Sequence, residues 1–119
     1  MKRARGLRRR LEHMLQGIAR IEHLTAGRTV DHYLTDEGLR EMIERNIARI
    51  SEAARFVPNE VRGRYPDVPW RRIVGIGNVI GHDYDEIDDR VMWDTATERL
   101  LPLKEVVERI LREIEATEP

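Results

Sequence analysis

The chain has 119 residues, of which 36% are charged and 5% are aromatic, and its formal net charge at pH 7 is −1. This length suits one domain, and the composition favours helices with solvated faces over a β-sandwich. The absence of cysteine excludes disulfides and thiolate metal sites, and no apolar run approaches the roughly 20 residues of a membrane span.

The first predicted element is a helix of about five turns near the N-terminus. Its apolar residues recur at three- and four-residue steps, which is the spacing of one helix face: Leu7, Leu11, Met14, Ile18 and Ile21. Gly27 follows this face and suits the end of a helix. Residues 29–34 are expected to form a short helical turn.

A second long helix is predicted between a cap at Thr35 or Asp36 and Pro58. One face collects the residues Leu39, Ile43, Asn46, Ile47, Ile50, Ala54 and Val57. Glu41 and Arg45 form a favourable pair one turn apart on the other face. Thr35 or Asp36 is the expected N-cap, and Pro58 is expected to end the helix.

Residues 59–65 suit one short helix, and Pro69 then introduces a helix that begins at Trp70. The buried face of that helix is predicted to consist of Ile73, Ile76, Val79 and Ile80. Gly75, Gly77 and Gly81 interrupt it, at a cost of roughly 1 kcal/mol each relative to alanine. Such a cost indicates that another backbone or a ligand comes close.

Asp88 or Asp89 can cap the last long helix, which Pro102 should kink or break. No segment alternates as a strand does. The predicted fold is therefore all-α: one domain over residues 1–119, an antiparallel bundle of four to five helices. The basic N-terminus lacks the apolar segment of a secretory signal, so we expect a cytoplasmic protein.

Charge is unevenly distributed along the chain. One basic run comprises Lys2, Arg3, Arg5, Arg8, Arg9 and Arg10, and a second comprises Arg55, Arg62, Arg64, Arg71 and Arg72. Acidic residues gather between Asp83 and Asp89. A solvated helix start explains the first run, and phosphate contact with RNA is the alternative.

The most informative stretch for chemistry contains Asn78, His82, Asp83 and Tyr84. Asn78 and His82 are four residues apart and share a helix face. An accessible histidine can remove a proton from a ribose 2′-hydroxyl or protonate a leaving oxygen. Tyr84 joins His82 only if the helix unwinds near Asp83 or if two subunits share the site. Taken alone, this pattern is also that of an ordinary surface histidine.

The remaining candidates favour structural roles. The other histidines, His13, His23 and His32, lack metal-ligand spacing, and His13 and His23 are expected on helix surfaces. Trp70 and Trp93 are interpreted as core residues rather than base-stacking platforms. The acidic run is interpreted as a solvated loop rather than a cation site. We therefore expect no metal and no cofactor.

Four segments together resemble a known family. They are residues 45–53, which begin Arg-Asn and end Glu-Ala, the Pro-Trp entry at residues 69–75, the stretch at residues 78–84, and residues 91–93. In this order they resemble the HepT-like proteins of the HEPN domain class, over about residues 7–114. The resemblance implies a helical HEPN bundle that forms a homodimer, with two motif copies facing one cleft.

The resemblance also implies the activity of a metal-independent endoribonuclease, the toxin of a toxin–antitoxin pair, acting on tRNA or mRNA. The family motif is Arg, four residues, His, one residue, Tyr. His82 matches its general acid or base, with Asn78 in the same motif. Tyr84 matches the tyrosine that assists it and that accepts AMP from ATP. The implied partner, which transfers the AMP, is a minimal nucleotidyltransferase antitoxin such as MntA.

The chain departs from the family at the motif arginine, because Gly77 stands at its position and Gly81 stands where some relatives carry an arginine instead. Arg45, Arg71 and Arg72 are the candidates to hold the scissile phosphate in its place. Two interpretations therefore stay open: an active ribonuclease toxin, and a protein of the same fold that binds a nucleotidyltransferase or RNA without cleavage. A purely structural helical dimer has the fewest features in its favour.

Overall fold

The computed structural model describes residues 2–82 and 88–117, and the side chains of residues 5–80 and 88–117. Within these ranges the chain is almost entirely helical and contains no strand, which confirms the predicted all-α bundle. The elements in chain order are α1 (Lys2–Thr25), α2 (Val30–Thr35), α3 (Glu37–Ala54), α4 (Asn59–Gly63), α5 (Trp70–His82), α6 (Asp89–Asp94), the π-helical segment η2 (Thr95–Arg99) and α7 (Leu100–Thr117).

Several of the helix boundaries lie where the sequence predicts them. Gly27, two residues after α1, has a φ of 71°, a conformation that favours glycine. Asp36 caps α3 by accepting a hydrogen bond from the Leu39 amide at 3.0 Å. Asp88 caps α6 in the same way, through the amides of Arg90 and Val91.

The last long helix continues past Pro102 without a break. The segment η2 lies directly before α7, and Pro102 is the third residue of α7. A proline ring clashes with the carbonyl four residues earlier in an α-helix, and a wider π-helical turn relieves this clash. The disturbance predicted for Pro102 is therefore present as a π-helical turn on its N-terminal side.

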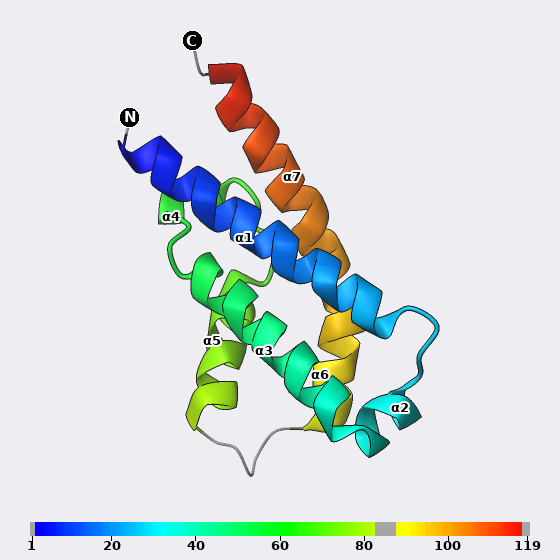
Figure 1. The fold of residues 1–119 in the computed structure, drawn as a ribbon. Helices are drawn as coiled ribbons and strands as arrows, with labels where there is room; N and C mark the ends of the chain where they lie inside the picture. Colours follow the sequence, from blue (N-terminus) through cyan, green and yellow to red (C-terminus); the bar gives the residue numbers. More distant parts are fainter. Residues whose placement is uncertain (1, 83–87, 118–119) are drawn as a thin grey trace.

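Figure 1 shows the arrangement of the long helices. Helix α3 runs antiparallel to α1 and packs against it, and α7 runs antiparallel to α1 on another side. Helix α5 packs against α3, and both chain ends lie at one end of the bundle. The molecule measures 50 × 29 × 23 Å because α1 and α7 extend together beyond the other helices.

The core lies between α1, α3, α5 and α7. Its largest fully buried side chains are Tyr33, Leu11, Met14, Ile18, Ile21, Ile43, Ile47, Ile50, Leu103, Ile110 and Val107. Tyr33 packs against Trp93 with ring centroids 5.8 Å apart, and its hydroxyl donates to Glu44. Burial raises the pKa of the Tyr33 hydroxyl. Trp70 is buried and Trp93 is half-buried against the core, as expected of packing residues.

Helices α1 and α3 approach each other closely at Gly17, which is buried. A Cβ atom added to Gly17 would lie 2.8 Å from Ile50 Cγ1 and 3.5 Å from the carbonyl oxygen of Asn46. The absence of a side chain at this position therefore sets the spacing of the two helices. The spacing of α1 and α3 in turn determines the depth of the groove between them.

We expect Gly17→Ala to destabilise the fold by about 1–3 kcal/mol, because the added methyl group overpacks the α1–α3 contact. This loss outweighs the roughly 1 kcal/mol by which alanine favours a helix interior over glycine. Urea denaturation followed by circular dichroism measures the change. The matched control is Gly6→Ala in the same helix, where no atom lies within 4 Å of an added Cβ. That variant should be neutral or more stable, and equal effects at the two positions would contradict the packing argument.

Candidate functional site

The predicted motif lies at the C-terminal end of α5. His82 is the last residue of this helix, and its side chain lies outside the described residues. Tyr84 and Asp83 lie outside them altogether, as do the surroundings of Gly81. Asn78 is described and exposed, one helical turn before His82. The site is therefore built up from the α5 surface around Asn78.

Asn78 lines a groove of about 530 Å³ between α1, α3 and α5, which we call the first groove. Its lining residues are Arg10, His13, Arg45, Ala48, Arg49, Ser51, Glu52, Ala53, Arg55, Val74, Gly77 and Asn78. Four of these side chains are arginines and one is an acid, although the whole chain has a net charge of −1. The groove is thus a local positive surface next to the motif helix.

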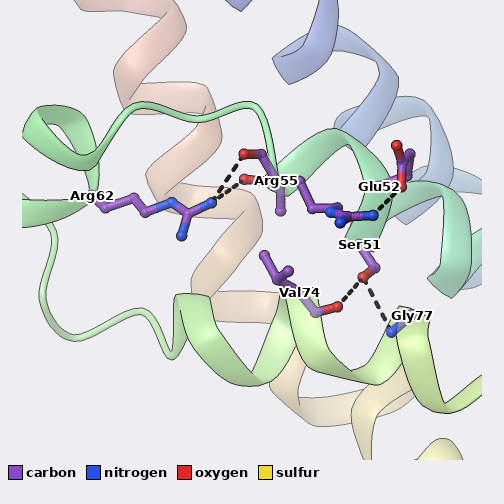
Figure 2. Close-up of polar contacts among 7 residues, drawn as sticks. Ser51, Glu52, Arg55, Arg62, Val74 and Gly77 are labelled. Atoms are coloured by element: carbon purple, nitrogen blue, oxygen red, sulfur yellow. Dashed lines mark hydrogen bonds and ion pairs between the residues drawn. The ribbon is translucent and has the colours of Figure 1, made fainter.

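The single acid of the first groove is neutralised. Glu52 Oε2 forms an ion pair with Arg55 Nη1 at 3.3 Å (Figure 2). The Arg10 guanidinium lies 3.8 Å over the centre of the Phe56 ring, which holds it at the groove edge. Within the part of the chain that the structure describes, no carboxylate lies within ion-pair distance of Arg45 or Arg49, so the predicted pair of Glu41 and Arg45 does not form. Their charges therefore face solvent in the groove.

The structure brings Arg45 and Asn78 together in this groove and separates the other two candidate arginines from it. Arg72 lines a distinct, mostly apolar cavity of about 70 Å³ on another side of α5, together with Arg99. Arg71 is exposed and lines none of the described grooves. Among the three arginines predicted to replace the motif guanidinium, Arg45 alone lines a groove with Asn78 within the described part of the chain.

The arginines of the second basic stretch do not lie together in the fold. Arg62 donates hydrogen bonds to the carbonyl oxygens of Ala54 and Arg55 (Figure 2). It also donates to the carbonyl oxygen of Val57, and together these bonds close the C-terminal end of α3. Arg64 forms an ion pair with Glu113 of α7 at 3.6 Å. These two arginines therefore stabilise the bundle, and only Arg55 of this stretch lines the first groove.

Ser51 occupies the space beside Gly77, where the family motif has its arginine. The Ser51 hydroxyl donates to the carbonyl oxygen of Val74 at 2.9 Å and accepts from the amide of Gly77 at 3.2 Å (Figure 2). A Cβ added at Gly77 would lie 2.8 Å from the Ser51 Cβ and closer still to its Oγ. Gly77 is therefore the position at which α5 makes the predicted close approach. The group it approaches is the Ser51 side chain of α3.

Four of the residues that line the first groove were not predicted as members of one site. Arg49 was not considered as a site residue, His13 was expected on a helix surface, and Arg10 belonged to the N-terminal basic run, for which phosphate contact with RNA was the alternative role. Ser51 was not singled out. The signal that was present is the spacing of residues 45, 49, 52 and 55, which places one row of charges along α3.

The structure offers no evident metal centre within its described side chains, where no three histidines, aspartates or glutamates gather. None of the described helices combines the length and the apolar character needed to cross a membrane. The first groove itself offers guanidinium, imidazole, carboxylate, hydroxyl and amide groups.

Comparison with known proteins identifies a family. Residues 14–110 match the family described as "Ribonuclease HepT-like". A protein of Thermococcus cleftensis named "Probable ribonuclease HepT" is 29% identical over 100 residues, covering 84% of this chain and 91% of that protein. A "Putative RNase" of Caldanaerobacter subterraneus subsp. tengcongensis is 28% identical over 102 residues, covering 86% and 91%.

A longer relative comes from Methanocaldococcus jannaschii and is named "Gamma-glutamylcyclotransferase and putative RNase". It is 29% identical over 105 residues, which cover 88% of this chain and 47% of the relative. The chain thus spans about half the length of that protein. No solved structure matches the chain.

We expect the contact between Ser51 and Gly77 to appear as coupling in a double-mutant cycle. Gly77→Ala alone should destabilise the fold by about 1–3 kcal/mol, because the new methyl group meets Ser51. The same substitution in a Ser51→Gly protein should cost at least about 1 kcal/mol less, since the obstructing side chain is gone. Urea denaturation of the four proteins gives the coupling energy.

The control for this cycle is Gly75→Ala, two residues earlier in α5, where an added Cβ meets no atom within 4 Å. This variant should show no coupling to Ser51→Gly. Additive effects of Ser51→Gly and Gly77→Ala, within about 0.5 kcal/mol, would contradict the assigned contact.

Proposed function

The chain belongs to the ribonuclease HepT-like family, and we propose that it is a metal-independent endoribonuclease, the toxin of a toxin–antitoxin pair in the cytoplasm. The proposed substrate is tRNA or mRNA. The family match and the relatives named as ribonucleases support the class of reaction.

The observation that carries the proposal is the positive groove beside the motif helix. Asn78 lines this groove, and the α5 backbone continues for one further turn to His82, about 6 Å along the helix axis. A phosphodiester bound by the guanidinium groups of α3 would therefore lie next to the end of α5. This is the position that an acid or base for RNA cleavage requires.

In the proposed reaction His82 acts on the ribose and phosphate at the cut site. Its imidazole removes the proton from the 2′-hydroxyl as that oxygen attacks phosphorus, or protonates the 5′-oxygen as the P–O bond breaks. Negative charge develops on the phosphoryl oxygens, and fixed cations stabilise it. Arg45 and Arg49 are the groups we assign to this role, because both line the first groove without an ion-pair partner among the described residues.

Tyr84 is the proposed assistant of His82 and the proposed site of control. A nucleotidyltransferase antitoxin of the MntA type would transfer AMP from ATP to the phenolic oxygen, which attacks the α-phosphorus and releases pyrophosphate. The attached nucleotide adds bulk and negative charge next to His82 and so repels the RNA backbone. A homodimer that brings two motifs to one cleft is part of the same proposal.

A second candidate function is binding of RNA or of the nucleotidyltransferase without cleavage. The observation that favours it is Gly77, whose neighbourhood is filled by Ser51 so that no arginine fits at the motif position. Loss of one such charge-stabilising donor typically lowers a rate by about 10²–10³. The two candidates agree on the fold and differ in whether an RNA bond is cut.

We expect the purified protein to cleave tRNA or mRNA in the presence of EDTA, and we expect His82→Ala to abolish this cleavage. The reason is that the reaction relies on an imidazole and on guanidinium groups rather than on a metal. Denaturing gel electrophoresis of labelled RNA measures the products. If neither protein cleaves RNA, the cleavage function is rejected and the binding function is favoured.

The paired variant Ser51→Gly with Gly77→Arg sharpens this test. If the scaffold lacks only the motif guanidinium, the pair should cut RNA about 10²–10³ times faster than the native chain. The single variant Gly77→Arg is the matched control and should lose stability rather than gain activity, because Ser51 remains in place. A paired variant that folds but is no faster would show that α3 already supplies the charge.

We expect Tyr84 to gain one AMP when the protein is incubated with ATP and a nucleotidyltransferase encoded beside it. Mass spectrometry of the intact chain and of its peptides measures the addition, and Tyr84→Phe should remain unmodified. Tyr65, which donates a hydrogen bond to Glu113, is the internal control and should not react. Modification of another residue, or none at all, would contradict the proposed control.

A further inference from the structure

The small cavity on the other side of α5, which we call the α5–η2 cavity, shares no lining residue with the first groove. Its volume is about 70 Å³, and exposed residues of α5 and η2 flank it. Its lining residues are Ile47, Ile50, Pro69, Arg72, Ile73, Ile76, Thr95, Arg99 and Leu100. An apolar cavity of about 150 Å³ holds one benzene molecule, with its six carbon atoms. The α5–η2 cavity therefore suits an apolar group of about three carbon atoms and is too small for a nucleobase.

The π-helical turn forms one wall of the α5–η2 cavity. The Leu100 amide donates to the carbonyl oxygen of Thr95, five residues earlier, and both residues line the cavity. In a regular α-helix, two residues five positions apart point about 140° away from each other. The wider turn brings them closer to one face, and π-helical turns of this kind are frequent at functional sites. The turn that precedes Pro102 therefore shapes the cavity.

Two cations without ion-pair partners lie at the α5–η2 cavity. Arg72 and Arg99 are exposed, and neither forms an ion pair within the described part of the chain. No carboxylate is among the described residues that line the cavity. A phosphate alone would meet these charges and leave the apolar space empty. The cavity therefore suits a short apolar group that is accompanied by a carboxylate.

The helix that borders the cavity carries a group of this kind. Val91 lies one turn before Thr95, whose hydroxyl donates to the Val91 carbonyl oxygen at 2.7 Å. The Val91 side chain has three carbon atoms and is 39% exposed, although it is apolar. Asp94, three residues after Val91, is exposed and has no ion-pair partner among the described residues. Residues three apart are neighbours on a helix surface, so Val91 and Asp94 present the apolar group and the carboxylate together.

We propose that the face formed by the α5–η2 cavity, Val91 and Asp94 binds the same face of a second copy of this chain. Thr95 and Arg99 of the cavity lie one and two turns after Val91, so a two-fold axis between Val91 and the cavity exchanges the two. Each copy inserts its Val91 into the cavity of the other. Each Asp94 meets the guanidinium groups at the partner's cavity.

The self-complementary arrangement is what favours a second copy over another occupant. An interface with two-fold symmetry requires both halves of each contact on one surface, and this surface carries the cavity with its cations and the valine with its carboxylate. A nucleobase does not fit the cavity. The inference rests on the proposed function only in taking the chain as a homodimer, and it adds where the two subunits meet.

Sedimentation equilibrium over a range of protein concentrations should show a monomer–dimer equilibrium. Val91→Ala should raise the dimer Kd at least about fivefold, the loss typical of an apolar side chain that anchors an interface. Ile76→Phe should also prevent dimerisation, because the added ring carbons occupy the cavity from within. The matched control is Met42→Ala, which shortens a 49% exposed side chain on the α1 side of α3 and should leave Kd unchanged.

Charge reversal tests the ion pairs across the interface. Asp94→Arg should raise Kd at least about tenfold, because like charges then face each other. Arg99→Asp should weaken the dimer for the same reason. The chain with both substitutions has the net charge of the native chain and pairs opposite charges again, so its Kd should return to within about threefold of the native value. Glu105→Arg, at an exposed position of α7, is the control for the change in charge and should have no effect.

The outcomes separate this inference from the proposed function. A chain that stays monomeric at every concentration overturns it, and so does a dimer that the substitutions at Val91, Ile76 and Asp94 leave unchanged. Circular dichroism establishes whether each variant folds, and if Ile76→Phe does not, the charge reversals at exposed positions decide. A dimer that depends on this face supports the inference even if the chain cuts no RNA. Cleavage of RNA by a monomeric chain supports the proposed reaction and overturns the inference.

Discussion

The close packing of α3 between α1 and α5 is the constraint on which the rest of the structure depends. On one side Gly17 of α1 lies against Ile50, and on the other side Gly77 of α5 lies against Ser51. Each pair of helices can approach this closely because the glycine at the contact has no side chain. Since α3 is held this close to both neighbours, the charged residues on its outer face lie along shared grooves instead of projecting separately into solvent.

The sequence predicts most of the fold because helices are encoded locally. The three- and four-residue spacing of apolar residues located α1 and α3, and the caps at Asp36 and Asp88 were predicted within one residue. A cap needs only a short polar side chain next to an amide three residues ahead. The π-helical turn was harder to predict, because Pro102 indicates that the helix is disturbed but not which kind of turn results.

The grooves could not be predicted in the same way, because they depend on which faces of distant helices meet. The charge row of α3 is readable from spacing, but its partner row on α1 is opposite only because the helices are antiparallel and meet at Gly17. Arg62 illustrates the converse, since it belongs to a basic stretch in sequence and yet binds carbonyl oxygens at the end of α3. A net charge of −1 therefore says little about the local field that an RNA strand would meet.

The contact between Ser51 and Gly77 also bears on how a phosphate could be held beside His82. In the family motif the guanidinium and the imidazole belong to one helix, so the backbone of that helix fixes their separation. In this chain the candidate guanidinium groups belong to α3, and their distance from the end of α5 depends on how the two helices pack. The Ser51 hydroxyl bonds to both Val74 and Gly77 of α5 and fixes that packing. If Arg45 and Arg49 hold the phosphate as proposed, its placement depends on the α3–α5 contact, whereas in the family motif one helix sets it.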